Sequence, residues 1–433
     1  MGQTLQLVGL QWGDEGKGKV IDALAGRFDV VIRFQGGANA GHTVQIGEQE
    51  FVLHLAPTGI LRPQALSILG NGMVIDPAGL IREIEGLREQ GVKVAENLVI
   101  SDRAHVVLPH HKLLDRLRES ARAGGRIGTT GSGIGPCYAD KATRDGIRFC
   151  DLMDPAVFRE RLEALMAMHN PIIERVHGAE PIDCDAVCKE YCAYAEVLRP
   201  HVRDTVPIIR QALDDGRNIL LEGAQGSLLD VDFGTYPFVT SSPVLTGAHT
   251  GSGIPASRID HVLGLAKAYC SRVGAGPFPT EQDNEVGETI RRTIGRLGGR
   301  EFGATTGRQR RCGWLDGVAL RYTARLGAVD SLAVSVLDVL GAFETIKVCT
   351  AYRLNGQTLT EFPSSAQTLA RVEPVYEELE GWRCDISEAR SWGELPPQAR
   401  AYLEFMEELA GAPVEFVSVG PKRTQVIERR VHG

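Results

Sequence analysis

The 433-residue chain lacks the features that mark membrane, secreted and repeat proteins. No apolar stretch approaches the roughly 18 residues that a membrane-spanning helix needs. Met1–Leu10 has neither the basic start nor the apolar block of a signal peptide. The chain also has no short tandem repeat and no low-complexity tail. We therefore expect a globular protein in the cytoplasm that makes no contact with a membrane.

Basic residues are not in excess, because Lys and Arg number 47 against 55 Asp and Glu, for a net charge of -8. Non-specific binding of nucleic acid needs a basic surface, so nucleic acid is not an expected partner. The nine cysteines include no CxxC pair, and reduced thiols suit a cytosolic chain. Cys184, Cys188 and Cys192 share the spacing of one helix face, where ordinary packing is favoured over a metal site.

Apolar runs predict an α/β fold. Hydrophobic residues make up 43% of the chain, which is enough for a large core. Four runs read as buried strands: Leu5–Leu10, Val30–Phe34, Asn218–Leu221 and Ser331–Leu337. Buried strands that alternate with helices predict a large, mostly parallel central sheet with helices on both faces. No linker divides the chain, so we expect residues 1–433 to form a single domain.

Helical periodicity separates these strands. The predicted helices are Pro77–Glu89, His110–Ala123, Pro155–Met168, Asp204–Leu213 and Ile259–Val273. The polar stretch 170–203 is weakly patterned, and with its neighbours it predicts a peripheral helical region at roughly 100–205. Glycine clusters follow several of the strands, and ligands bind beyond the carboxyl ends of strands in such sheets. The glycine loops are therefore expected to meet at one edge.

The first glycine loop has the spacing of a phosphate-binding loop. Gly13, Gly18 and Lys19 match the GxxxxGK pattern between a strand and a helix, in which backbone N–H groups and a lysine hold phosphates. The position after Lys19 is Val20, so the hydroxyl that usually binds Mg²⁺ is missing. Asp14 offers a carboxylate inside the loop instead. A glycine-rich turn with solvated charges remains the alternative.

Other loops carry single polar side chains. Asn39 and His42 lie on the loop after 30–34, where a histidine can donate a proton to a reacting oxygen. Thr130 lies in a hydroxyl-rich glycine loop, and Gln225 follows another predicted strand. Arg308, Arg310 and Arg311 form the densest basic cluster of this acidic chain. A guanidinium group can bind a carboxylate or a phosphate through two parallel hydrogen bonds. An anionic substrate is therefore favoured over a solvated basic face.

Seven of these stretches together resemble the adenylosuccinate synthetase family, over residues 5 to about 427. Any one glycine motif is weak, but seven in the family's order are specific. The stretches are QWGDEGKGK (11–19), GGANAGHT (36–43), IGTTGSGIGPCYADK (127–141), EGAQGSLLD (222–230), GTYPFVTSS (234–242), RVGAGPFPTE (272–281) and FGATTGRQRRCGWLD (302–316).

The resemblance implies a ligase of AMP biosynthesis that joins IMP to L-aspartate and splits GTP to GDP and phosphate. It also implies a GTP-binding architecture like that of P-loop proteins, with small antiparallel subregions. Asp14 would take the proton from N1 of IMP, and oxygen 6 would attack the γ-phosphate to give 6-phosphoryl-IMP. His42 would stabilise that oxygen and act as the acid. Mg²⁺, one per subunit, would be held by Asp14 and the carbonyl of Gly41. Arg144 would reach into the neighbouring subunit's IMP site, so a homodimer is implied.

The resemblance also implies three sets of contacts. GTP would contact Gly13, Asp14, Glu15, Gly16, Lys17, Gly18, Lys19, Gly41, His42, Thr43, Arg310, Val336, Leu337, Asp338, Ser418, Val419 and Gly420. IMP would contact Asp14, Glu15, Gly16, Lys17, Asn39, Ala40, Gly41, His42, Thr130, Arg144, Gln225, Thr240 and Arg308. Aspartate would contact the loop of Ala304, Thr305, Thr306, Gly307, Arg308, Gln309 and Arg310.

Two positions depart from the family pattern. Relatives usually have Thr-Lys-x-Asp where this chain has Ser335-Val-Leu-Asp338, so the lysine stem that would cross the guanine ring is replaced by Val336. Asp338 is kept, and its carboxylate can accept from guanine N1 and N2. Ser132 stands where relatives often have arginine, so we expect a phosphate or loop contact of that arginine to be missing.

Two other functions stay open at this stage. The first is a related enzyme that acts on another purine nucleotide, such as dGMP, or uses another triphosphate. The second is a nucleotide-dependent switch that binds a protein partner, although such a switch has little need for Asn39, Gln225 and the arginine-rich loop.

Overall fold

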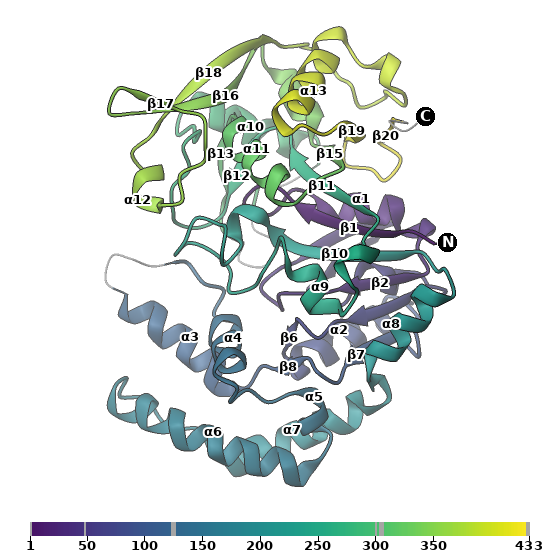
Figure 1. Ribbon diagram of the computed structural model, residues 1–433, viewed down its shortest axis with the longest axis vertical. Helices are drawn as coiled ribbons and strands as arrows, with labels where there is room; N and C mark the ends of the chain where they lie inside the picture. The colour runs from purple at the N-terminus through teal and green to yellow at the C-terminus, as the bar shows by residue number, and fades with distance from the viewer. Residues whose placement is uncertain (1, 47–48, 123–126, 299–300, 303–306, 430–433) are drawn as a thin grey trace.

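The structure, a computed structural model, describes residues 2–46, 49–122, 127–298, 301–302 and 307–429. Its centre is a ten-stranded sheet in the order β20-β19-β15-β11-β1-β10-β2-β5-β7-β9 (Figure 1). Neighbouring strands pair in parallel, except that β20 runs antiparallel to β19. Their bounds, in chain order, are β1 Thr4–Gly9, β2 Val30–Arg33, β5 Leu66–Leu69, β7 Leu98–Ser101, β9 Val202–Arg203, β10 Ile219–Gly226, β11 His261–Lys267, β15 Ser331–Ser335, β19 Val414–Ser418 and β20 Val426–Glu428.

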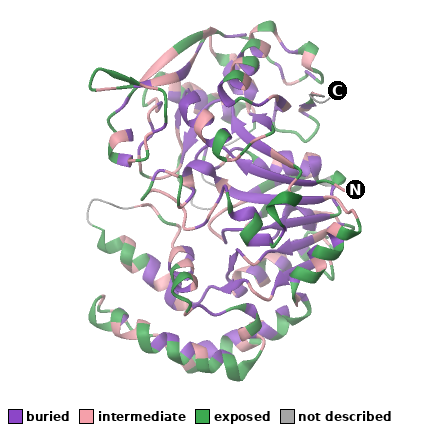
Figure 2. Ribbon diagram, in the orientation of Figure 1, coloured by how far each residue is buried: buried purple, intermediate pink, exposed green. Residues whose placement is uncertain are grey.

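The strands are continuous apolar runs because both faces of the sheet are covered. All six residues of β1 and all four of β2 are buried, and the sheet forms the buried centre of the molecule (Figure 2). The helices that follow or flank the strands are α1 Lys17–Leu24, α2 Pro77–Glu89, α8 Thr205–Asp214, α9 Gly247–Ser252, α10 Glu285–Arg296, α11 Gly317–Leu326, α12 Ala366–Leu369 and α13 Pro397–Ala410. The predicted fold class, a mostly parallel sheet flanked by helices, is confirmed.

A helical layer covers one end of the molecule (Figure 1). It contains α3 Pro109–Ala121, α4 Ile134–Thr143, α5 Phe149–Leu152, α6 Pro155–Arg175 and α7 Cys184–Leu198. This layer corresponds to the predicted peripheral helical region, although β7 and β9 at its two ends belong to the sheet. The face of Cys184, Cys188 and Cys192 lies on α7 and packs against an apolar cluster with Phe158 and Tyr191.

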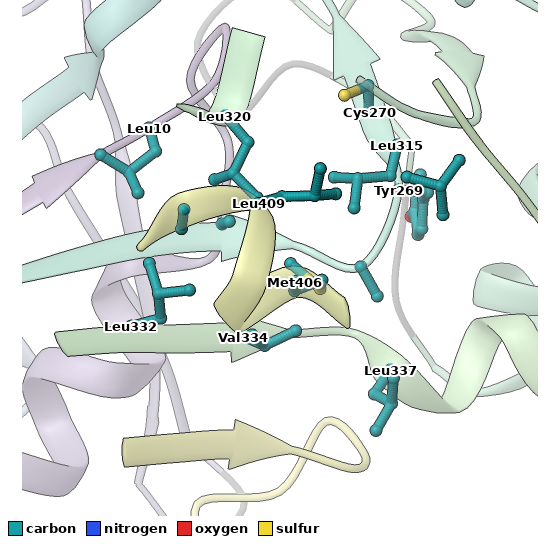
Figure 3. Packing of buried hydrophobic residues seen from close by; sticks show 14 of the residues in the cluster. Leu10, Tyr269, Cys270, Leu315, Leu320, Leu332, Val334, Leu337, Met406 and Leu409 are labelled. Atoms are coloured by element: carbon teal, nitrogen blue, oxygen red, sulfur yellow. The ribbon is translucent and has the colours of Figure 1, made fainter. Parts of the chain in front are cut away.

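Small sheets complete the fold. At the opposite end, β16 Thr345–Leu354 pairs antiparallel with β17 Gln357–Leu359 and β18 Glu373–Glu380, and parallel with β14 Leu315–Asp316. Three two-stranded pairs are β3 His42–Ile46 with β4 Gln49–Leu53, β6 Val74–Ile75 with β8 His105–Val106, and β12 Cys270–Arg272 with β13 Arg311–Gly313. The largest apolar cluster joins this end to the main sheet, and Leu10, Leu315, Leu332, Met406 and Leu409 pack within it (Figure 3).

One predicted helix is wrong. The stretch 259–273 forms strands β11 and β12 rather than a helix. Its apolar residues Val262, Leu263, Leu265 and Ala266 suit a helix turn, but β11 lies in the middle of the sheet between β1 and β15. Burial on both faces of a central strand removes the alternation that would have revealed it.

Candidate active site

The loop after β1 has an unusual backbone. Gly13, Asp14 and Gly16 all have positive φ, at 83°, 58° and 82°, and α1 begins at the next residue, Lys17. A glycine adopts this conformation at no steric cost, whereas Asp14 does so at some cost, as residues at functional sites often do. A Cβ on Gly18 would lie 2.7 Å from the carbonyl oxygen of Thr43, so only glycine lets the two loops approach. The strand, loop and helix predicted from the sequence are present in that order.

A buried ion pair shapes the inside of this loop. The carboxylate of Glu15 is fully buried and accepts hydrogen bonds from the backbone N–H groups of Gln11 (3.1 Å) and Gly13 (3.0 Å). Lys17, also buried, pairs with the same carboxylate. Because its charge is balanced and its oxygens are hydrogen-bonded, Glu15 stabilises the turn that presents the loop's N–H groups.

Asp14 belongs to a chain of alternating charges. Its Oδ2 accepts from Nε of Arg310 at 2.7 Å, Nη1 of Arg310 also donates to Glu301 at 3.1 Å, and Nζ of Lys267 donates to Glu301 at 2.8 Å. Burial acts to lower the pKa of Arg310, but the carboxylates of Asp14 and Glu301 outweigh it and raise that pKa. The guanidinium therefore stays charged beside Asp14.

His42 is oriented by a second buried carboxylate. Its Nδ1 lies 2.6 Å from Oε1 of Glu222, and Oε2 of Glu222 accepts from the backbone N–H and the hydroxyl of Thr58, each at 2.8 Å. Burial acts to raise the pKa of Glu222, but His42 and Arg33 outweigh it and lower it, so Glu222 is ionised and Nδ1 of His42 carries the proton. Nε2 of His42 is buried and has no hydrogen-bond partner in the described part of the chain.

Most of the predicted ligand-binding residues surround one cavity of about 730 Å³. Its walls come from loops at the carboxyl ends of strands and from segments far apart in the sequence. The predicted residues that line it are Gly13, Asp14, Glu15, Gly16, Lys17, Gly18, Lys19, Asn39, Ala40, Gly41, His42, Thr43, Thr130, Gln225, Gly307, Arg308, Arg310 and Val336. This volume is typical of small-ligand sites, and the lining is unusually rich in charge.

The amides of Gln225 and Asn39, which line the cavity, form a network with Thr240, which does not line it. Gln225 Nε2 donates to Asn39 Oδ1 at 3.1 Å, and Asn39 Nδ2 donates to Thr240 Oγ1 at 3.3 Å. Thr130 Oγ1 donates to Ser132 Oγ at 3.0 Å, so the serine found in place of the usual arginine contacts a predicted IMP residue. Arg308 Nη2 donates to the carbonyl of Gly128 at 2.6 Å, which joins the arginine-rich loop to the Thr130 loop.

The predicted guanine-side residues lie together beside the first turn of α1. Lys19 Nζ donates to Ser418 Oγ at 2.6 Å and to the carbonyl of Gly420, so in this structure the lysine contacts the segment 418–420. Burial lowers the pKa of Lys19 to about 8, and it raises the pKa of Asp338 to about 6. Val336 has φ 51°, a conformation that is strained for a β-branched side chain. Leu337, Asp338, Ser418, Val419 and Gly420 lie beside the cavity lining rather than in it.

Five further predicted residues either do not line the cavity or lie outside the described residues. Arg144 is exposed at the C-terminal end of α4 and does not line the cavity of its own chain. Ala304, Thr305 and Thr306 lie outside the described residues. Gln309, just beyond them, is exposed and bridges to Phe302.

Sequence reasoning missed three charged residues of the site: Glu222, Glu301 and Lys267. Each is almost fully buried, and each contacts a predicted residue or its partner. Glu222 is the first residue of the stretch EGAQGSLLD (222–230). A charged residue at the end of a predicted buried strand could have indicated a functional role. Glu301 and Lys267 gave no local signal, because their pairing joins segments 34 residues apart.

Comparisons with known proteins agree with this geometry. The family model described as adenylosuccinate synthetase matches residues 6–427. The chain is 53% identical over 425 residues to the adenylosuccinate synthetase of Pelotomaculum thermopropionicum and 51% identical over 425 residues to that of Carboxydothermus hydrogenoformans, and in both cases 98% of each chain is covered.

Solved structures extend the comparison. The fully ligated adenylosuccinate synthetase of Plasmodium falciparum superposes with a TM-score of 0.92 at 37% identity, covering 99% of this chain and 100% of that one. The succinoaminodeoxyadenylate synthetase of cyanophage S-2L, at 21% identity and a TM-score of 0.60, shares the fold. The match over nearly the whole chain, together with the site described above, shows that this chain belongs to the adenylosuccinate synthetase family of ligases.

Proposed function

We propose that this site joins IMP and L-aspartate to give adenylosuccinate, with the splitting of GTP to GDP and phosphate. The observation that carries the proposal is the arrangement of Asp14 and His42. Both side chains line one cavity, each is held by a charged partner, and Nε2 of His42 has no protein partner among the described residues. A partly exposed carboxylate and a buried imidazole with one unused nitrogen suit two proton transfers on one ligand.

Asp14 accepts the proton from N1 of IMP in the first step. Oxygen 6 of the base then attacks the γ-phosphorus of GTP, so that an O–P bond forms, the bond to the β–γ bridging oxygen breaks, and GDP leaves. In the second step the neutral amine of aspartate attacks C6 of 6-phosphoryl-IMP, the C6–O bond breaks, and phosphate leaves together with the proton that the amine loses. Arg310 lies against Asp14 and is positioned to neutralise negative charge that develops beside it.

His42 donates from Nε2 to oxygen 6 only when its ring carries two protons. In the ligand-free protein, burial lowers the pKa of His42 more than Glu222 raises it, and the positive charges of Arg33 and Lys17 lower it further. Bound phosphates bring negative charge into the cavity and offset those cations. Substrate binding is thus expected to charge the ring, with Glu222 stabilising the imidazolium.

The cavity lining suggests how the three substrates are divided. The loop of residues 13–19 and Thr43 would hold the GTP phosphates, with Asp338 and residues 418–420 toward guanine. Asn39, Thr130, Gln225, Thr240 and Arg308 would hold IMP, and the loop of residues 304–310 would hold aspartate. These positions follow the family pattern, and the hydrogen bonds among Asn39, Gln225 and Thr240 support the IMP assignment.

Mg²⁺ is the metal that this donor set fits. The carboxylate of Asp14 and the backbone of Gly41 line the same cavity, and Mg²⁺ prefers oxygen ligands of this kind together with phosphate oxygens. When bound, Mg²⁺ would neutralise charge on the phosphates. The residues of the chain that would hold it are Asp14 and Gly41.

Three further expectations of the family complete the proposal. The chain acts as a homodimer in which Arg144 of each subunit completes the partner's IMP site, and its exposure at the end of α4 leaves it available for that contact. Residues 1–433 act as one domain, because the site draws on segments from Gly13 to Gly420.

The location is cytoplasmic. Among the described residues, no helix is long and apolar enough to span a membrane.

An absorbance assay for adenylosuccinate tests the proposal. We expect product from IMP, L-aspartate, GTP and Mg²⁺, and no GTP hydrolysis when IMP is left out. Parallel reactions with dGMP in place of IMP, and with ATP in place of GTP, test the related-enzyme alternative. Absence of product with IMP plus GTP would overturn the proposal, and turnover with dGMP alone would favour the alternative.

A further inference from the structure

A second cluster of titratable side chains lies in the peripheral helical layer, apart from the cavity. The carboxylate of Asp140 on α4 faces three imidazoles. Oδ2 lies 3.1 Å from Nε2 of His110 and 2.9 Å from Nε2 of His111, both on α3, and Oδ1 lies 3.2 Å from Nε2 of His169 on α6. His110 and His111 are almost completely buried, as is Asp140, whereas the His169 side chain is 13% exposed. The reaction at the cavity uses none of these groups.

The spacing within this cluster suits a transition metal. The ligand atoms of His110, Asp140 and His169 all lie within 4.8 Å of one another. Tetrahedral zinc with bonds of about 2.0–2.1 Å places its ligand atoms about 3.3 Å apart. Nε2 of His110 lies 3.1 Å from Oδ2 of Asp140, and Nε2 of His169 lies 3.2 Å from the other oxygen, Oδ1, so each distance is close to that edge. Two imidazoles and a carboxylate are ligands that zinc and its neighbours prefer, whereas Mg²⁺ prefers oxygen ligands alone.

His111 has a different role from His110 and His169. Its Nδ1 accepts from the backbone N–H of Leu108 at 2.9 Å, so its proton is on Nε2 and is donated to Oδ2 of Asp140. This contact orients the carboxylate and leaves Oδ1 toward His169. Nδ1 of His110 and Nδ1 of His169 have no hydrogen-bond partner in the described ranges. In the ion-free chain the carboxylate of Asp140 accepts from Nε2 of both rings, so an ion must displace these protons, and the Nδ1 of each ring can take up the proton as the tautomer changes.

We propose that His110, Asp140 and His169 form a binding site for a divalent transition metal of the zinc class, with His111 holding the carboxylate in place. The partly exposed side of His169 provides the entry path and the position for a water ligand. The ion joins α6 to α3 and α4, which lie side by side in the helical layer (Figure 1). Arg144 ends α4 one turn beyond Asp140, so the ion would also stiffen the helix that presents Arg144.

Metal titration of the untagged, chelator-treated chain tests this site. We expect the protein to retain one Zn²⁺ per chain after dialysis, measured by elemental analysis, and to do so in an excess of Mg²⁺. Co²⁺ in its place should give the visible absorption of a four-coordinate nitrogen and oxygen site. Thermal unfolding should shift to higher temperature with Zn²⁺. His169→Gln should weaken Zn²⁺ binding by at least about tenfold, because it removes a ligand at a partly exposed position.

The control is His177→Gln, the same substitution just beyond the end of α6, which should bind Zn²⁺ like the unaltered chain. If the unaltered chain retains no Zn²⁺ after dialysis, the proposal is wrong, whatever the variants do. An intense thiolate-to-cobalt absorption band would place the ion on cysteines and would also overturn it. Equal affinity in His169→Gln and His177→Gln would do the same, provided that both unfold at similar temperatures in chelator.

Discussion

The ring nitrogen Nδ1 of His42 lies 2.6 Å from Oε1 of Glu222, a carboxylate that is completely buried and is 180 residues away in the sequence. The other oxygen of Glu222 is held by both donors of Thr58. A carboxylate fixed in this way sets the tautomer and orientation of the imidazole and stabilises its charged form, as in other carboxylate–histidine pairs. Glu222 is therefore a positioning residue that acts through His42.

Glu222→Gln should lower kcat by about 10²- to 10⁴-fold, the contribution typical of a positioned acid or base. The KM for GTP should stay nearly unchanged, because Glu222 contacts no phosphate. Loss of the carboxylate lowers the pKa of the imidazolium, so the alkaline limb of the kcat–pH profile should move to lower pH. Thr58→Val, which removes only a hydroxyl on the far oxygen, should cause a much smaller fall. An unshifted profile in Glu222→Gln would show that the pair is structural.

The sequence predicted those parts of the site that depend on local patterns. The first loop has glycines where its backbone needs positive φ, and α2 begins at the predicted proline, Pro77. It did not predict Glu222 as the partner of His42, or the pairing of Lys267 with Glu301, because each pair is created by strand order rather than by spacing. The helix predicted over 259–273 is wrong for the same reason, since only the neighbours of β11 decide that it is a strand.

Asp14→Asn should lower kcat by about 10²- to 10⁴-fold, because the amide accepts a hydrogen bond from Arg310 but takes no proton from N1 of IMP. Arg310 keeps its contact with Glu301, so the loop should hold its shape. Initial rates of adenylosuccinate formation measure the effect. Asp215→Asn, an exposed carboxylate at the end of α8, is the matched control. Turnover near that of the control would rule out Asp14 as the base.

GTP binding should weaken as the pH falls through about 6, because burial raises the pKa of Asp338 to about 6. Above this pH the carboxylate is charged and, in the proposed site, would accept from guanine N1 and N2; below it one oxygen carries a proton and this recognition would be lost. The KM for GTP should therefore rise as the pH falls from 7.5 to about 5.5, in steady-state assays at saturating IMP and aspartate. In Asp338→Asn the KM should be high at both pH values. A KM that follows pH equally in both proteins would refute the role of Asp338.

Val336→Lys should both stabilise the chain and tighten GTP binding. The valine has φ 51°, and relief of this β-branched strain is worth on the order of 1 kcal/mol in the free energy of unfolding. A lysine stem across the guanine ring adds about 0.8 kcal/mol for each buried CH₂, so the KM for GTP should fall by about three- to tenfold. Val336→Leu separates the two effects, because it relieves the strain without supplying the long stem. Equal KM values for the two variants would show that this position does not contact guanine.

Arg144 allows a test of the homodimer that depends on both subunits. If Arg144 completes the partner's site, then Arg144→Ala and Asp14→Asn should each be nearly inactive alone, because each pure dimer has two defective sites. In an equal mixture half of the dimers are mixed, and each mixed dimer has one site with both residues intact. Activity should therefore recover to about a quarter of that of the unaltered chain after mixing. If subunits exchange slowly between dimers, activity should not recover when the two proteins are combined only at the start of the assay. If mixing restores no activity although light scattering shows dimers that exchange subunits, Arg144 does not act across the interface.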